Sequence, residues 1–152
     1  MIRGFEIVED KYRKHPDCEI ALPQRGTSRS AGYDLCTPVE IRIAPRGCSK
    51  IIFTDIKAYM LADEVVCTYV RSSIGMKKGL VLANTTGIID SDYYSNPDND
   101  GNLGVNLFNL GTTDYIIKKG DRIGQCMFIN YLVADNGNTE DVRMGGFGST
   151  NK

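Results

Sequence analysis

The sequence predicts an all-β sandwich or barrel, and three observations carry that prediction. Short segments rich in β-branched and aromatic residues recur along most of the chain. Turn-forming residues separate these segments at short intervals. No segment sustains the apolar period of a long helix. A chain of 152 residues can bury roughly 70% of its unfolded surface, so we expect one core and one main domain.

Seven segments have the composition of strands. In chain order they are VEIRIA (39–44), SKIIF (49–53), EVVCTYV (64–70), GLVLA (79–83), GVNLFNL (104–110), TDYIIKK (113–119) and RIGQCMFI (122–129). Turns are indicated by APRG (44–47), KGD (119–121) and NGN (136–138). The one short helix that we expect is SSIGMKKG after Arg71, with Ser72 or Ser73 as its N-cap. There is no internal repeat.

The last segment, VRMGGFGSTNK (142–152), differs from the rest because glycines surround a single Phe147. Such a segment cannot be rigid by itself. A frayed terminus is one interpretation. A lone aromatic in a Gly-rich, Ser/Thr-ended arm also suits a lid, whose ring stacks on a flat ligand while its amides contact an anion. We therefore divide the chain into a β-barrel domain (1–141) and a flexible arm (142–152).

Bulk composition excludes several classes of protein. The net charge is −1, with 18 basic and 19 acidic residues, which provides no broad surface for nucleic acid or an anionic membrane. The apolar runs are too short to span a bilayer, and the N-terminus lacks the apolar core of a signal peptide. The five cysteines are odd in number and irregularly spaced, as is typical of reduced, packed thiols. We expect a cytoplasmic protein.

Several common chemistries lack their motifs. There is no P-loop and no G-x-G-x-x-G after a strand. His15 is the only histidine, so a Ser-His-Asp relay or a His-rich metal site would depend on it alone. Residues 98–102 superficially resemble a calcium loop, but the glycine is at the fourth position instead of the sixth, and position 109 is Asn instead of Glu. An EF-hand is rejected.

Short polar segments punctuate the strands. They place Asp34 in SAGYDL, Arg71, Ser72 and Ser73 in YVRSSIG, and Gln125 in GDRIGQ. Taken singly, each residue is explained by a structural role: a turn, a surface ion pair, a helix cap or a solvent-facing strand position. Together, a forked guanidinium, two hydroxyls and the backbone amides of a helix start suit a phosphate.

The segment GIIDSDYYSNPDNDGN (87–102) contains four aspartates. Asp90 follows an apolar run, so we expect its carboxylate at the edge of a buried hairpin, where partial burial would suit it as a general base. We expect Asp92 to support the turn. Asp98 and Asp100 are expected to be solvated turn residues.

These segments together resemble the homotrimeric dUTPase family over nearly the whole chain. Its five ordered motifs are matched by AGYDL (31–35), RSS (71–73), GIIDSDY (87–93), GDRIGQ (120–125) and GGFGST (145–150). The resemblance implies a distorted jelly-roll barrel of the β-clip type. It also implies a homotrimer in which each active site draws on three chains and receives a swapped C-terminal arm.

The resemblance implies hydrolysis of dUTP to dUMP and pyrophosphate, with a Mg2+ ion chelated by the triphosphate. This activity removes dUTP from the nucleotide pool and supplies dUMP for dTMP synthesis. Asp90 matches the family's water-activating carboxylate. Arg71, Ser72, Ser73 and Gln125 match its phosphate-binding positions.

Other positions carry further implied roles. Asp34 shapes the site and the water shell of the metal without ligating it directly. Tyr93 packs on the deoxyribose, and Phe147 stacks over the uracil. The backbone that reads uracil is provided by Asn84, Gly87, Ile88 and Ile89, and the tail residues that close on the phosphates are Gly148, Ser149 and Thr150.

The sequence departs from the family pattern in two places. After Tyr93 the family usually continues with Arg-Gly into the next strand, whereas here the insert YSNPDNDGN (94–102) intervenes. The fifth motif commonly has an arginine five residues before its Phe. Here Val142 holds that position and Arg143 lies one residue closer, so we assign Arg143 to the γ-phosphate.

Two alternatives share this pattern. A dCTP deaminase, or a bifunctional deaminase and diphosphatase, has the same fold and an Arg-Ser-Ser segment, but GIIDSDY and GGFGST favour the diphosphatase. The second alternative is a phage-derived regulatory protein that retains the dUTPase shell. The intact Asp90 and tail argue against it.

Overall fold

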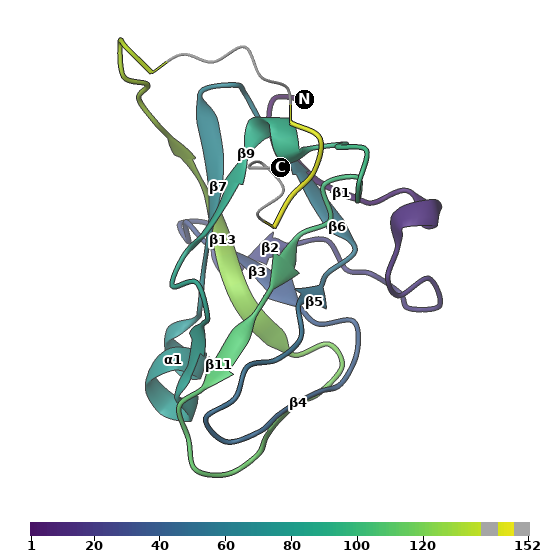
Figure 1. Cartoon of the computed structure of the whole chain (residues 1–152), viewed down its shortest axis with the longest axis vertical. Coiled ribbons are helices and arrows are strands. Elements are labelled where there is room, and N and C mark those ends of the chain that lie inside the picture. The colour runs from purple at the N-terminus through teal and green to yellow at the C-terminus, as the bar shows by residue number, and fades with distance from the viewer. Residues whose placement is uncertain (138–142, 148–152) are drawn as a thin grey trace.

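The computed structural model describes residues 1–137 and 143–147. Its strands are β1 (Gly4–Ile7), β2 (Gln24–Arg25), β3 (Tyr33–Cys36), β4 (Ile41–Ile43), β5 (Ile52–Phe53), β6 (Ile56–Tyr59), β7 (Glu64–Tyr69), β8 (Leu80–Leu82), β9 (Gly87–Asp90), β10 (Gly104–Val105), β11 (Leu107–Asn109), β12 (Tyr115–Ile117) and β13 (Arg122–Asn130) (Figure 1). Within the described residues there is one α-helix, α1 (Ser72–Lys78), and two 3-10 turns, η1 (Asp10–Tyr12) and η2 (Ser91–Tyr93). The all-β prediction is confirmed.

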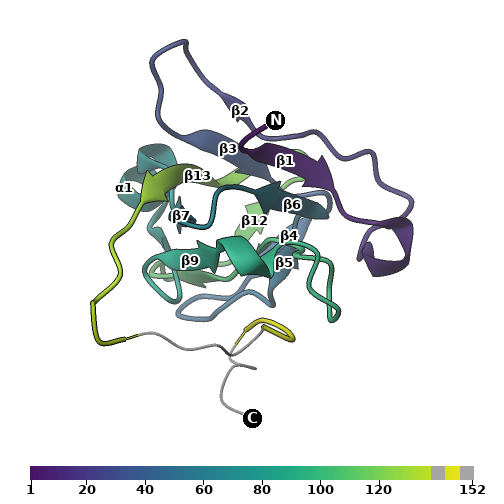
Figure 2. The same cartoon turned by 90° about the horizontal axis from the view of Figure 1, so that it is seen from above.

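The strands form one five-stranded sheet and four two-stranded ladders, all antiparallel. The large sheet has the order β2-β3-β13-β7-β9, and the ladders pair β1 with β6, β5 with β10, β8 with β11 and β4 with β12. Seen from above, β3 and β13 lie on one side of the interior, and β9 and β5 lie on the other (Figure 2). Leu35, Val66, Leu107 and Ile123 are fully buried there. Burial of these apolar side chains is the main stabilising contribution to the fold.

Each of the seven segments predicted to be strands contains one or two strands. The prediction missed β1, β2, β3 and also β6, which is almost entirely buried. Its sequence contains Lys57, whose charge interrupts the apolar pattern from which strands are inferred. Lys57 is nevertheless buried, because its ammonium lies 2.9 Å from the carboxylate of Asp100.

The helix is where the sequence predicts it, but its cap is different. Arg71 is the N-cap residue, with extended backbone, and no side chain caps the helix. The Arg71 carbonyl instead accepts hydrogen bonds from the amides of Ile74 and Gly75, both at 2.9 Å. The prediction of Ser72 or Ser73 as the N-cap is therefore wrong. The helix ends at Gly79, whose φ of 64° suits glycine.

The insert 94–102 folds back over the N-terminal part of the chain. Asp98 is exposed, as expected, but the prediction that Asp100 is solvated is wrong, because its exposed fraction is 2%. Its carboxylate accepts hydrogen bonds from Lys57 and from the amide of Glu9, the latter at 2.8 Å. Lys57 lies 43 residues away from Asp100 in the chain. The residues next to Asp100 in the sequence therefore do not indicate that its carboxylate is buried.

All five cysteines are free, as predicted. Cys67 and Cys126 are buried, and burial raises the pKa of the Cys126 thiol to about 12. This thiol is therefore protonated and unreactive at neutral pH.

Candidate active site

A cavity of about 320 Å³ lies against β9 at one edge of the large sheet. Most of its lining consists of residues that the sequence singled out. The lining residues are Asn84, Gly87, Ile88, Ile89, Asp90, Tyr93, Leu103, Gly104, Arg143, Gly146 and Phe147. Sequence reasoning missed Leu103, Gly104 and Gly146.

The backbone of β9 borders this cavity. Among the described residues, β9 pairs with β7 along one edge only, with Gly87 opposite Thr68 and Asp90 opposite Val65. A side chain at position 87 would bring its Cβ within 2.2 Å of the Thr68 hydroxyl oxygen, so glycine is required for this close pairing. The other edge of β9 has backbone N–H and C=O groups available to a ligand, as at any sheet edge.

The predicted hairpin around Asn84 has a different structure. β8 pairs with β11, whereas β9 pairs with β7. The turn between them, in which Thr85 has a φ of 62°, therefore joins two different sheets. A paired hairpin was the wrong prediction, because local turn residues specify a reversal of the chain but not which strand becomes the partner.

Asp90 lies at the end of β9, where its carboxylate meets Arg143. One guanidinium NH2 group contacts Asp90, and Nε lies 2.6 Å from the carboxylate of Asp92. The Asp90 side chain remains 46% exposed, so water has access to it. Arg143 thus joins the C-terminal segment to both acidic residues of the GIIDSDY motif.

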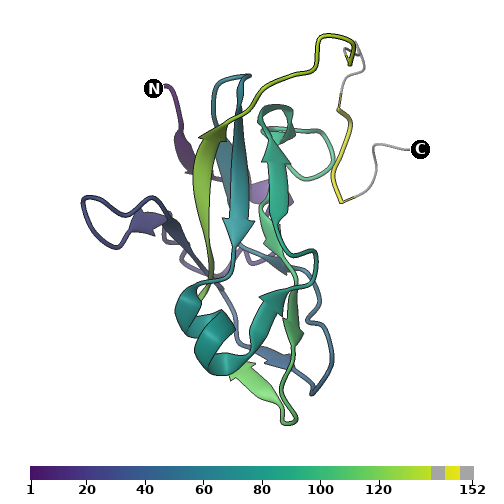
Figure 3. The same ribbon diagram turned by 90° about the vertical axis from the view of Figure 1, so that its left-hand side faces the viewer.

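Two aromatic rings border the same cavity. Phe147 packs edge-on against Tyr93, with ring centroids 6.5 Å apart, and against Phe53, at 5.7 Å. Gly104 makes this approach possible, because a Cβ there would lie 2.8 Å from the Phe147 ring. A glycine inside an apolar strand segment is a general signal of such an approach, and it could have identified Gly104 from the sequence. In Figure 3 the segment 143–147 runs beside β9.

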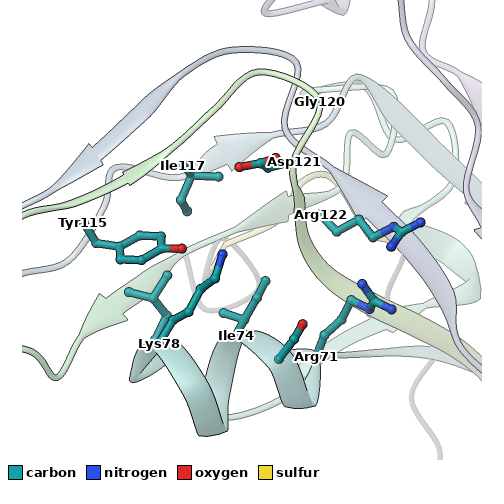
Figure 4. Close-up of a pocket in the computed structure, with 10 residues that line it drawn as sticks. Arg71, Ile74, Lys78, Tyr115, Ile117, Gly120, Asp121 and Arg122 are labelled. Carbon is teal, nitrogen blue, oxygen red and sulfur yellow. The ribbon is translucent and has the colours of Figure 1, made fainter.

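A second cavity, of about 330 Å³, lies beside α1. Figure 4 shows the guanidinium groups of Arg71 and Arg122 next to each other at its rim, with Lys78 projecting from the helix. Asp34 lies between the two arginines, 3.0 Å from Nε of Arg71 and 3.1 Å from Nε of Arg122. Ser73 also lines this cavity. Three cationic side chains around one opening favour an anionic ligand.

Two other predicted phosphate contacts lie near this second cavity. Ser72 is exposed at the first position of α1. Gln125 lies on β13 opposite Asp34 and Tyr69, and its amide packs against Gly32, where a Cβ would lie 2.3 Å from the amide oxygen. The predicted residues Gly148, Ser149 and Thr150 lie outside the described residues.

Asp90 and Arg71 lie at opposite ends of β7. Asp90 pairs with Val65 near the start of this strand, and Arg71 follows its last residue, Tyr69. At roughly 3.3 Å per residue, the six positions from 65 to 71 separate Asp90 from Arg71 by about 20 Å. In Figure 1, β9 runs away from α1, and its end that leads into η2 lies far from the helix. A single chain therefore does not bring all the predicted site residues together.

The fold defines an all-β protein, and its two cavities are lined by carboxylate, aromatic and cationic side chains. The family model described as dUTPase matches residues 18–151. The chain is 46% identical over 151 residues to the deoxyuridine 5'-triphosphate nucleotidohydrolase of Lactococcus lactis, covering 98% of this chain and 97% of that protein. It is 36% identical over 143 residues to the protein of the same name from Tolumonas auensis, covering 88% and 89%. The chain belongs to the dUTPase family.

Solved structures agree with this assignment. The dUTPase of Streptococcus mutans superposes with a TM-score of 0.75 at 36% identity, covering 87% of this chain and 98% of that one. The dUTPase of the Staphylococcus aureus phage phi11 superposes with a TM-score of 0.72 at 20% identity, covering 98% and 99%. The second similarity concerns the fold alone.

Proposed function

We propose that this protein hydrolyses dUTP to dUMP and pyrophosphate, with Asp90 as the general base. The observation that carries the proposal is the position of Asp90, half-exposed, at the end of an edge strand that lines a cavity of about 320 Å³. Asp90 takes a proton from water, and the water oxygen bonds to the α-phosphorus. The bond from that phosphorus to the bridging oxygen breaks, and pyrophosphate leaves. No covalent enzyme intermediate forms.

Uracil selection is assigned to the free edge of β9. The backbone of Asn84, Gly87, Ile88 and Ile89 offers a fixed order of donors and acceptors to the polar edge of the base. Cytosine exchanges two of these groups and would leave polar groups unpaired, which makes discrimination large. We assign the exclusion of thymine to a lack of room for its 5-methyl group at this edge. Phe147, at the same cavity, is assigned to stacking over the base.

The phosphates are assigned to a second chain. The separation of about 20 Å along β7, at roughly 3.3 Å per residue, is too long for the α-phosphate at Asp90 to lie near Arg71 of the same chain. Arg71, Ser72, Ser73 and Gln125 of a neighbouring chain would complete the site. This supports a homotrimer with shared active sites. We also propose that the arm (142–152) is swapped in the trimer and that its Arg143, Gly148, Ser149 and Thr150 close on the phosphates, whereas in the single chain Arg143 contacts Asp90 of the same chain.

We propose that the triphosphate of the substrate binds the Mg2+ ion. The described residues contain no group of three or more His, Cys, Asp or Glu side chains that would hold a metal, and Mg2+ commonly binds through substrate phosphates. Both carboxylate oxygens of Asp34 already contact arginines, so this residue fits a contact through water. When bound, the ion neutralises phosphate charge. Asp34 contacts both Arg71 and Arg122 and so fixes the positions of these two cationic side chains.

The activity is tested by incubating the purified protein with dUTP, dCTP, dTTP and UTP, with and without Mg2+. We expect pyrophosphate release from dUTP alone, dependent on Mg2+. Ammonia release from dCTP would overturn the assignment in favour of a deaminase. Absence of pyrophosphate with every nucleotide would favour a regulatory protein.

Mixing two inactive variants tests whether sites are shared between chains. Arg71→Ala removes the phosphate contact and Asp90→Asn removes the base, so each homotrimer should be nearly inactive. After unfolding and joint refolding, mixed trimers contain sites that combine an intact Arg71 from one chain with an intact Asp90 from another. We expect activity to return in the mixture. A mixture as inactive as its components would show that both residues act within one chain.

Tyr93 is assigned to contact with the deoxyribose, where it leaves no room for a 2'-hydroxyl. Tyr93→Ala opens this side of the cavity, so we expect UTP hydrolysis to rise and the preference for dUTP over UTP to fall by about 10- to 100-fold. The values of kcat/KM for the two nucleotides measure this preference. An unchanged preference would contradict a steric role for the ring.

A further inference from the structure

The insert 94–102 forms hydrogen bonds with the hydroxyl of Tyr93. The residue is 7% exposed, and its ring lines the cavity beside β9. The hydroxyl donates a hydrogen bond to the backbone carbonyl of Asn102, at 3.1 Å, and accepts one from the side-chain amide of Asn99, at 2.7 Å. The ring edge that faces the cavity and the hydroxyl that faces the insert are thus parts of one buried side chain.

The Asn99 side chain is itself oriented by two donors. Its oxygen accepts hydrogen bonds from the Gly101 amide, at 3.0 Å, and from the Asn96 side chain, at 2.8 Å. Because both of these groups are donors, the amide NH2 of Asn99 must point the other way, toward Tyr93. Asn99 is 5% exposed, so water does not compete effectively for these bonds.

The insert also contacts the main chain of Tyr93. The Asn96 side chain donates to the Tyr93 carbonyl at 2.8 Å. Gly101, with a φ of 82°, lies so close that a Cβ there would be 2.7 Å from the same carbonyl oxygen. Tyr93 is therefore held both at its backbone and at the far end of its ring. The insert itself is anchored to β6 through the buried pair of Asp100 and Lys57.

We propose that Asn99 is a positioning residue that makes the Tyr93 ring a rigid wall of the sugar pocket. The inference rests on the proposed function, in which this ring excludes a 2'-hydroxyl. The Tyr93 ring can exclude UTP only if it does not move away from the sugar. Displacements of about 1 Å change reaction rates greatly in enclosed sites. The hydrogen bond from Asn99 opposes retreat of the ring. The insert, which the family pattern does not require, thus affects the selection of dUTP over UTP by keeping the Tyr93 ring in position.

Asn99→Ala tests this inference. We expect the ratio of kcat/KM for dUTP over UTP to fall by about 10-fold, chiefly because UTP turnover rises. A residue with a merely structural role would lower both activities together. Tyr93→Phe, which keeps the ring but loses the hydrogen bonds of the hydroxyl to Asn99 and to the Asn102 carbonyl, is expected to lower the ratio at least as much. The double variant should have nearly the ratio of Tyr93→Phe, because the hydrogen bond from Asn99 to Tyr93 is already lost in that variant.

Asp100→Asn is the matched control. Asp100 is buried in the same insert, but its carboxylate contacts Lys57 and the Glu9 amide instead of Tyr93. We expect this variant to lower the melting temperature and to retain the dUTP preference. A loss of preference in Asp100→Asn as large as in Asn99→Ala would overturn the inference, since it would mean that general loosening of the insert is sufficient.

The outcomes separate this inference from the proposed function. A wild-type protein that hydrolyses UTP as well as dUTP contradicts the role of Tyr93 itself. A wild-type preference for dUTP that stays within twofold in Asn99→Ala contradicts the positioning role alone. If Asn99→Ala does not fold, Tyr93→Phe decides, because it leaves the insert intact; an unchanged preference in that variant overturns the inference.

Discussion

Asp90→Asn is expected to lower the turnover of dUTP by about 10²- to 10⁴-fold, the usual contribution of a general base. The amide has nearly the shape of the carboxylate but cannot accept a proton from water at neutral pH. Nucleotide binding should persist, because the free edge of β9 and the aromatic rings remain. Single-turnover kinetics and calorimetric titration with a non-hydrolysable dUTP analogue would measure the two quantities separately.

The matched control is Asp92→Asn. Asp92 is the second carboxylate that contacts Arg143, with Nε at 2.6 Å, but it is not assigned to water activation. Its change also weakens the attachment of Arg143 and should reduce turnover far less. Equal losses in the two variants would mean that Asp90 acts by holding Arg143. A turnover in Asp90→Asn close to that of the wild type would contradict the assignment of the base.

Truncation before Gly145 is expected to lower activity by on the order of 10²-fold or more, because the groups that close over the nucleotide are lost. The truncated chain retains Arg143 and the whole barrel. We therefore expect its molecular mass in solution, measured by light scattering, to remain that of the intact trimer. Steady-state kinetics with dUTP would measure the loss.

Phe147→Ala in the full-length chain is the companion variant. It removes the ring that packs against Tyr93 and Phe53 while leaving the rest of the arm. We expect a smaller loss than in the truncation, mostly in KM, because stacking stabilises bound substrate and transition state alike. Full activity in the truncated protein would contradict the proposed role of the arm. If the truncated protein no longer forms the trimer, the arm has a role in assembly.

Much of the fold was predictable because it depends on local patterns. Segments such as 64–70 and 122–129 combine β-branched residues with apolar runs, and both are strands of the large sheet. The part of the cavity beside β9 that residues 84–93 form was also predictable, because these residues are close together in the chain. Gly104 was missed although glycine in a strand is a recognisable signal.

The insert shows where local patterns mislead. Asn96, Asn99 and Asp100 have the composition of an exposed turn, and all three are buried. Their partners are Tyr93, Lys57 and the amide of Glu9. Buried polar groups are compatible with a stable fold only when such partners are in place. For Asp100 these partners are far away in the chain, whereas those of Asn96 and Asn99 lie within the insert or at Tyr93.

The sequence by itself determined the strand-rich architecture and the family, because strand composition and ordered motifs are properties of contiguous residues. Only the tertiary structure decided which residues share a cavity. It placed Asp90 and Arg71 at opposite ends of β7, since an extended strand converts each residue of separation into roughly 3.3 Å. It also placed the insert behind Tyr93, because the buried Asp100 and Lys57 attract each other across the fold. Distances of this kind depend on how strands pair, and pairing is a property of the whole chain.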